Sequence, residues 1–235
     1  MGPHGLIIAI DGPAGAGKST VARELARRLG YVYVDTGAMY RVVGLLAREH
    51  GVAADDGPRL GELAGAVSIR FVAGSDAEQS VFADGRDVTA TIREQDAGEW
   101  ASKVSTRPEV RERMVAAQRE MGRNGGVVLE GRDIGTVVFP DADLKFYLDA
   151  SAEERGRRRY RQLRERGEPA SLAAIVAEIE SRDRRDLSRA HSPLRCAPDA
   201  LRVETTTLAP QTVITELLEH CRERLRSAGA KVRKP

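Results

Sequence analysis

A glycine-rich stretch near the N-terminus carries the clearest chemical signal in the sequence. The letters GPAGAGKST at 12–20 fit the pattern G-x-x-x-x-G-K-[ST], between an apolar run and a helical pattern. Such glycines let backbone N–H groups surround a phosphate, while the lysine reaches the outer phosphates and a hydroxyl binds Mg²⁺. We therefore predict a phosphate-binding loop (P-loop) for ATP, with Lys18 catalytic and Ser19 a metal ligand. Its residues are Gly12, Pro13, Ala14, Gly15, Ala16, Gly17, Lys18, Ser19 and Thr20.

A P-loop does not by itself say where the phosphoryl group goes. GTPases, motor ATPases and small-molecule kinases all use one. The chain has no N-K-x-D motif for reading guanine, and 235 residues are few for a motor. A small kinase remains, and it needs a second anion site that faces the first.

Charged residues at the ends of two later strands are candidates for that second site. The predicted strand 31–35 ends in DTGAMYR, where Thr36 either caps the next helix or meets substrate, and Arg41 lies one turn further on. For Arg41 a solvent-exposed position and a site position are equally open. Strand 126–131 ends in EGRDIG, where the arginine can clamp a phosphate and the glutamate can hold a magnesium water. Its charged residues are Glu130, Arg132 and Asp133.

An arginine-rich helix is predicted at about 152–167, and the stretch 153–168 contains seven arginines. A positively charged lid over a triphosphate would have this composition, since it neutralises the transferring group and excludes water. A solvated helix face and an RNA-binding surface are the alternatives. Gly156 lowers the helix propensity here, which would leave a lid mobile.

The next helix, 172–190, ends in a cluster of charges. Its apolar face is expected from Leu172, Ile175, Val176 and Ile179. On a helical wheel Arg182, Asp186 and Arg189 border this face, so they should be partly buried and paired or bound to ligand. The arginines that should point away from it are Arg184 and Arg185.

Alternating strands and helices must position these residues. Apolar strands are predicted at 6–11, 31–35, 126–131, 144–150 and 200–205, and helices at 17–29, 38–50, 107–122, 152–167, 172–190 and 210–227. Between 66 and 90, period-2 alternation with turns at Gly74–Asp76 and Asp84–Gly85 predicts a small antiparallel sheet. We predict a three-layer α/β fold with a five-stranded, mainly parallel sheet, in which every motif lies at a strand's carboxyl end.

The composition of the chain limits the kinds of partner that it can bind. The net charge of +2 argues against a nonspecific nucleic-acid binder. No apolar run reaches the ~20 residues of a membrane span, and the N-terminus does not read as a signal peptide. Cys196 and Cys221 have no metal-site spacing, which suits a reduced cytoplasm. We expect no membrane and no nucleic-acid partner.

Four motifs in this order resemble the bacterial cytidylate kinases: IDGPAGAGKST, DTGAMYR, EGRDIGTVVFPDA and SRDRRDLSRAHSPL. The resemblance covers about 5–226 and implies transfer of the γ-phosphoryl group of ATP to CMP or dCMP by a cytoplasmic monomer. It also implies one P-loop kinase domain across 1–235. Its expected parts are a core at about 5–60, 125–150 and 195–226, a nucleotide-monophosphate-binding insert at about 61–124, and an arginine-rich lid at about 151–190.

The resemblance assigns roles to residues of the later motifs. It implies that the acceptor phosphate binds to Arg41, Arg132 and Arg189. The sugar would bind to Arg182 and Asp186. The cytosine would bind to Ser102, Arg111 and Asp133. The resemblance places ATP and the transferring phosphoryl group on Arg155, Arg158 and Arg159. Thr36 stands where the family uses a serine or threonine hydroxyl. Besides Lys18, the expected catalytic residues are Arg132, Arg158, Arg159 and Arg189.

Two other functions stay open at this point. A kinase for UMP, AMP or another metabolite would share everything but the cytosine-reading residues. An RNA-associated protein that uses its P-loop as a switch is less favoured, because aromatic residues, on which bases would stack, are only 4% of the chain.

Overall fold

The computed structural model describes residues 2, 4–74, 79–94, 96–189 and 191–232. It divides the chain into two compact units. The first unit contains Met1–Tyr33 and Asn124–Pro235, and the second contains Val34–Arg123. The expected core, insert and lid boundaries stay predictions.

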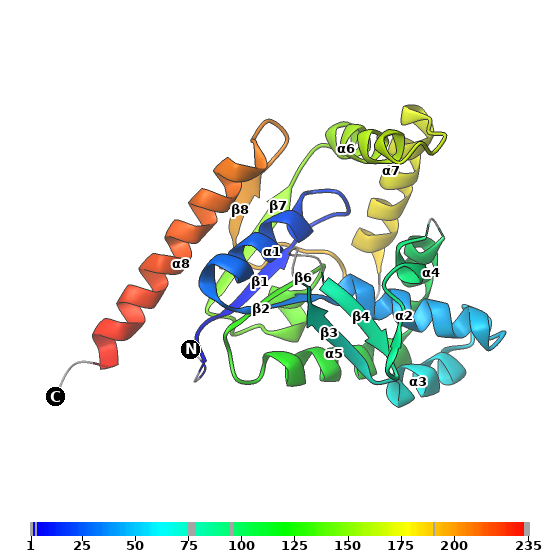
Figure 1. Cartoon of the computed structure of the whole chain (residues 1–235), viewed down its shortest axis with the longest axis horizontal. Coiled ribbons are helices and arrows are strands. Elements are labelled where there is room, and N and C mark those ends of the chain that lie inside the picture. Colours follow the sequence, from blue (N-terminus) through cyan, green and yellow to red (C-terminus); the bar gives the residue numbers. More distant parts are fainter. Residues whose placement is uncertain (1, 3, 75–78, 95, 190, 233–235) are drawn as a thin grey trace. The chain divides into compact units, whose positions relative to one another are not determined.

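The first unit is built on a five-stranded sheet with the order β2-β6-β1-β7-β8 (Figure 1). Strand β1 lies at its centre and pairs in parallel with β6 and β7, and β7 pairs in parallel with β8. The central strands are buried apolar runs, as parallel strands covered on both faces require. The strands are β1 (Ile7–Asp11), β2 (Val32–Asp35), β6 (Val127–Gly131), β7 (Leu144–Asp149) and β8 (Leu201–Glu204), β2 continuing into the second unit.

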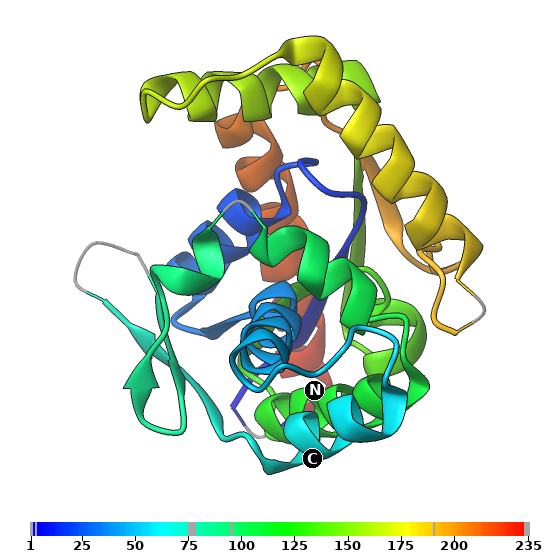
Figure 2. The same ribbon diagram turned by 90° about the vertical axis from the view of Figure 1, so that its right-hand side faces the viewer.

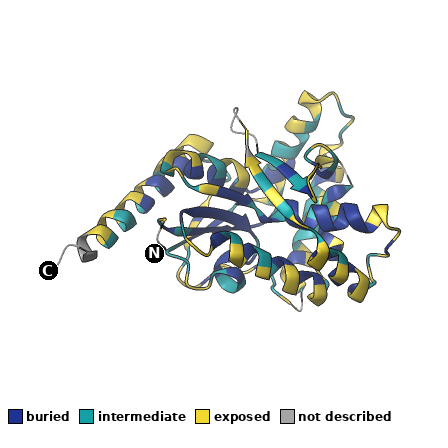
Figure 3. Cartoon of the chain, turned by 60° about the horizontal axis from the view of Figure 1, so that its bottom comes forward, coloured by how far each residue is buried: buried dark blue, intermediate teal, exposed yellow. Residues whose placement is uncertain are grey.

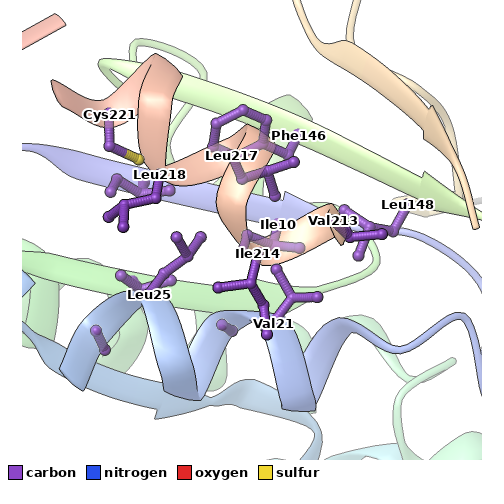
Figure 4. Packing of buried hydrophobic residues seen from close by; sticks show 14 of the residues in the cluster. Ile10, Val21, Leu25, Phe146, Leu148, Val213, Ile214, Leu217, Leu218 and Cys221 are labelled. Carbon is purple, nitrogen blue, oxygen red and sulfur yellow. The ribbon is translucent and has the colours of Figure 1, made fainter. Parts of the chain in front are cut away.

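Helices α1 (Lys18–Leu29) and α8 (Pro210–Val232) pack together and share one core with this sheet. Along α8, buried and exposed residues recur on opposite faces (Figure 3). Figure 4 shows the apolar side chains that meet between these helices and the strands. The labelled residues are Ile10, Val21, Leu25, Phe146, Leu148, Val213, Ile214, Leu217, Leu218 and Cys221. This core fixes the two ends of the P-loop, which joins β1 to α1.

Two further helices, α6 (Ala152–Glu165) and α7 (Leu172–Ser188), pack against each other (Figure 2). The Ser151 hydroxyl accepts a hydrogen bond from the Glu154 N–H at 3.2 Å and so caps α6. The close approach of α6 to α7 needs a glycine, because a Cβ added at Gly156 would lie 2.4 Å from Val176 Cγ2. Gly156 thus has a packing role that helix propensity alone does not reveal.

The second unit combines helices with a three-stranded antiparallel sheet, β3-β4-β5. Two apolar clusters hold it together, both of them built partly on α2. Its elements are α2 (Thr36–Glu49), α3 (Gly57–Ala66), β3 (Ile69–Ala73), β4 (Gln79–Ala83), β5 (Arg86–Asp87), the 3₁₀-helix η1 (Thr91–Arg93), α4 (Ala97–Val104) and α5 (Pro108–Gly122).

The predicted α/β class, the five parallel strands and the small antiparallel sheet are confirmed. The turn at Asp84–Gly85 is present, whereas the predicted turn at Gly74–Asp76 lies partly outside the described residues. Helices α3 and α4 were not predicted, because their short apolar patterns merge with the neighbouring loops.

The structure decides one open alternative and corrects one prediction. Asp35 caps α2, since its carboxylate accepts from the Ala38 N–H at 3.0 Å, so of the two alternatives for Thr36 only the contact with substrate stays as a prediction. The apolar face of α7 is only partly buried: Ile175 is buried, but Leu172 is 36% exposed. The reason is that α7 packs chiefly on α6, along a narrower strip than its apolar pattern suggests.

The contact at Gly156 gives a test with a matched control. We expect Gly156→Ala to lower the free energy of unfolding by about 1–3 kcal/mol, because the β-branched Val176 cannot move aside cheaply. Gly229→Ala in α8 meets nothing within 4 Å and should be neutral or gain up to ~1 kcal/mol. Urea denaturation of both variants checks this, and equal effects would show that α6 and α7 do not approach so closely.

Candidate active site

The P-loop backbone follows a path that only glycines allow. Gly12 has φ +147°, and a Cβ there would lie 2.0 Å from the Leu148 carbonyl oxygen of the neighbouring strand. Gly17, with φ +91°, is the N-cap of α1. The loop therefore passes close to β7 and turns directly into a helix N-terminus, where backbone N–H groups and the helix dipole favour an anion.

Lys18 is buried just inside that helix. Its Nζ donates to the Pro13 carbonyl at 2.6 Å. Burial, reinforced by the positive charge of Arg132, lowers the pKa of Lys18 to about 7. A phosphate beside the ammonium would favour its charged form again, because an opposite charge raises the pKa of a lysine.

Ser19 lies beside a buried carboxylate. Its hydroxyl donates to Glu130 Oε2 at 3.0 Å, and the Tyr33 hydroxyl donates to Glu130 Oε1. A serine hydroxyl next to a carboxylate is a pair of hard oxygen donors of the kind Mg²⁺ prefers. The donor set thus fits the predicted metal, with Ser19 as its ligand.

Asp11, at the end of β1, holds the loop that follows β6. Its oxygens accept from the N–H groups of Ile134 and Gly135 at 2.8 and 2.7 Å. Burial raises the pKa of Asp11 to about 6, although these two hydrogen bonds act in the opposite direction. The loop that carries Arg132 and Asp133 is therefore tied to the strand that begins the P-loop.

Asp186, near the end of α7, lies between arginines. Arg132 Nε donates to its Oδ2 at 2.9 Å, and Arg189 donates to its Oδ1. Burial by itself would raise the pKa of Asp186, but the charges of Arg132, Arg189 and Arg182 together hold it below its ordinary value. Asp186 thus pairs with Arg189, as expected of a partly buried charge, whereas Arg182 contributes positive charge beside it. Arg184 and Arg185 are exposed as expected.

The arginines of α6 differ in their surroundings. Arg155 is buried and donates to backbone carbonyls and to Asp183. Arg158 donates to the Thr205 carbonyl at 2.5 Å and to Glu154 at 3.1 Å, and Arg159 is half-buried. Only part of this helix is a solvated face, because its inner arginines make specific contacts at the end of β8 and around the P-loop.

In the second unit, the start of α2 carries two predicted residues. Thr36 is buried as the first residue of the helix. Arg41 lies one turn along and contacts the capping carboxylate of Asp35 at 3.4 Å. This half-buried ion pair is long and therefore weak, so it leaves the guanidinium able to bind an anion.

Ser102 and Arg111 also lie in the second unit, on α4 and α5. Both contact Ser105: its hydroxyl donates to the Ser102 carbonyl at 3.1 Å, and Arg111 donates to the Ser105 carbonyl at 3.4 Å. Arg111 stacks on Tyr40, 5.7 Å from the ring centroid. The buried Ser102 hydroxyl has no hydrogen-bond partner within the described part of the chain.

The predicted residues thus form a group in each unit. The first unit holds the P-loop, Asp133, the Asp186 cluster and the α6 arginines, and the second holds Thr36, Arg41, Ser102 and Arg111. Sequence analysis missed four residues of the first unit that contact these groups. Three of them lie at a strand end or in a charged stretch, and Tyr33 lies within β2. The four are Asp11, Tyr33, Asp183 and Thr205.

Comparisons with known proteins agree on one family. A family model described as cytidylate kinase matches residues 8–223. A cytidylate kinase of Geobacter sp. (strain M21) is 50% identical, over 94% of this chain and 95% of that protein. A bifunctional pantoate ligase/cytidylate kinase of Synechococcus sp. (strain JA-3-3Ab) is 47% identical, over 95% of this chain but 42% of that protein.

A likeness to a solved structure concerns the fold alone. An uncharacterized protein from Eubacterium ventriosum ATCC 27560 superposes with a TM-score of 0.51 at 10% identity, covering 92% of this chain and 98% of that one.

The burial of Asp11 predicts a pH effect on stability. Because its pKa is about 6 in the folded protein against 3.8 for the free side chain, folding binds a proton between these values. As pH falls from about 6 to about 4, wild type should therefore gain stability relative to Asp11→Asn, by up to ~3 kcal/mol. Urea denaturation of both proteins from pH 4 to 7 measures this, and a constant difference would contradict it.

Proposed function

The chain belongs to the cytidylate kinase family, and we propose that it transfers the γ-phosphoryl group of ATP to CMP or dCMP through the residues described above. The products are ADP with CDP or dCDP. One observation supports the residue assignment most strongly: the first unit contains, beside its P-loop, a buried carboxylate held by arginines that α7 and the end of β6 supply.

The P-loop and its surroundings take the role of the ATP site. Backbone N–H groups of the loop and the N-terminus of α1 would surround the phosphates, and Lys18 would reach the outer ones. Mg²⁺ would be held by Ser19, with Glu130 accepting hydrogen bonds from its waters. When bound, the ion neutralises phosphate charge, while Glu130 keeps the Ser19 hydroxyl in place.

The arginines around Asp186 take the role of the acceptor site. Arg132 and Arg189 each present a guanidinium that can share its donors between Asp186 and a phosphate. Asp186 accepts hydrogen bonds only, so it suits the hydroxyls of a sugar. Arg182 supplies further positive charge beside it, and Arg41 of the second unit is assigned to the same phosphate.

Cytosine recognition is assigned to Ser102, Arg111 and Asp133. The base offers an N4 amino donor and the acceptors O2 and N3, which match a carboxylate or hydroxyl and a guanidinium. Support comes from the buried Ser102 hydroxyl, which has no hydrogen-bond partner among the described residues. A bound base would supply that partner. Arg111, stacked on Tyr40, is oriented before any ligand arrives.

The chemistry follows from positioning and charge. The acceptor phosphate of CMP is largely ionised at neutral pH, because the second pKa of a phosphate is about 6. A general base is therefore not needed, and the phosphoryl group passes directly in line without a covalent enzyme intermediate. Lys18, Arg132 and Arg189 stabilise the charge of the transferring group and hold the two reactants together. Arg158 and Arg159 are assigned to the same group.

The partners follow from this activity. Nucleotides are the substrates, and the monomeric state, the cytoplasmic location and the lack of a nucleic-acid partner stay predictions. In the residues that the structure describes, every helix is too short or too polar to span a bilayer.

The test is ADP formation from ATP and Mg²⁺ with CMP, dCMP, UMP, AMP and GMP offered separately. We expect turnover with CMP and dCMP at least ~100-fold above the purine nucleotides, because a mismatched base leaves buried polar groups unpaired. Lys18→Ala should remain folded and lose turnover. Strong turnover with AMP or GMP would remove the cytosine-reading assignment, and an active Lys18→Ala would remove the mechanism.

A further inference from the structure

Backbone carbonyls of the P-loop are held by side chains from elsewhere in the first unit. When the N–H groups of such a loop face a phosphate, its carbonyl oxygens need other donors. Arg155 Nη1 donates to the Ala14 carbonyl at 3.1 Å, and Thr205 Oγ1 donates to the Ala16 carbonyl at 3.1 Å. Because these donors come from α6 and the end of β8, the path of the loop depends on residues far along the chain.

The Arg155 guanidinium binds protein acceptors on all of its nitrogens. Nε donates to the Ala150 carbonyl at 2.8 Å, and Nη1 is shared between Ala14 and Asp183 Oδ1, at 3.1 Å in each case. Nη2 donates to Asp183 Oδ2 at 2.5 Å, which completes a bidentate ion pair. The predicted contact of Arg155 with ATP stays a prediction, and these hydrogen bonds point to a second role through the loop backbone.

Packing holds the stem of Arg155 against the loop as well. Gly15 has φ +78°, and a Cβ there would lie 3.1 Å from Arg155 Cβ. The Arg155 side chain is only 5% exposed and that of Asp183 17%. A charge this deeply buried is costly unless paired, so Asp183 decides whether the guanidinium can stay beside Ala14.

We propose that Asp183 is a positioning residue, which holds Arg155 against the Ala14 carbonyl and so keeps the P-loop backbone in the shape that binds ATP. One turn further along α7, Asp186 organises the arginines of the acceptor site. A single helix thereby supports both sites, the donor site through Asp183 and the acceptor site through Asp186. This inference rests on the proposed kinase function for the identity of the two ligands.

The test compares Asp183→Asn with Glu180→Gln, which removes an exposed carboxylate from the same helix. Calorimetry measures the Kd of ATP without acceptor and of CMP without ATP. We expect Asp183→Asn to raise the Kd of ATP about tenfold, the usual effect of losing a charged hydrogen bond, and the Kd of CMP less than about twofold. Glu180→Gln should change neither.

A second pair of variants tests whether Arg155 and Asp183 act as one unit. Arg155→Ala should weaken ATP binding at least as much as Asp183→Asn, and the double variant should be no worse than Arg155→Ala alone. Additive effects, equal weakening of ATP and CMP, or unchanged ATP affinity would each overturn the proposal. If Asp183→Asn does not fold, the ATP affinity of Arg155→Lys is measured instead, because lysine keeps the positive charge but cannot form the bidentate pair with Asp183. An Arg155→Lys variant that binds ATP as tightly as wild type would then overturn the proposal.

These outcomes are separate from a failure of the proposed function. ATP affinity is measured without turnover, so the role of Asp183 is tested whichever acceptor wild type uses. If the wild-type protein binds ATP but does not bind CMP, only the proposed identity of the acceptor is wrong.

Discussion

A carboxylate that is 1% exposed cannot stay ionised in a protein without partners, and this constraint organises the candidate active site around Asp186. Its partners are arginines from the end of β6 and from α7, which lie far apart in the sequence. Their pairing keeps the pKa of Asp186 low and gathers positive charge at one place. The same groups that stabilise the carboxylate thus form a site for an anionic acceptor.

A related constraint applies to the backbone of the P-loop, whose polar groups need hydrogen-bond partners. Its glycines allow the close approach to β7, and its carbonyls are satisfied by Arg155 and Thr205. Asp11 in turn ties the loop after β6 to β1. The donor and acceptor groups of the first unit are therefore joined by hydrogen bonds rather than by proximity alone, which is the kind of preorganisation that phosphoryl transfer needs.

Sequence patterns predict much of this, and the limits have physical causes. The P-loop and the parallel strands follow from local motifs and apolar runs, and the helical wheel separates Asp186 from Arg184 and Arg185. The wheel cannot identify partners in other elements, so it misses the pairing of Asp183 with Arg155. Helix propensity suggests that Gly156 weakens its helix. The structure shows instead that the glycine is needed for close packing against Val176. Asp35 and Thr36 both make good caps, and only backbone geometry decides between them.

The most direct test of the account is the steady-state kinetics of Asp186→Asn, with circular dichroism to confirm folding. The change keeps the shape of the side chain but removes its negative charge and replaces one of its two acceptor oxygens by an NH2 donor. The account predicts that the KM for CMP rises more than about tenfold, since a charged hydrogen bond is lost, while the KM for ATP changes less than about twofold. An equal rise in both KM values would contradict the placement of the acceptor at Asp186.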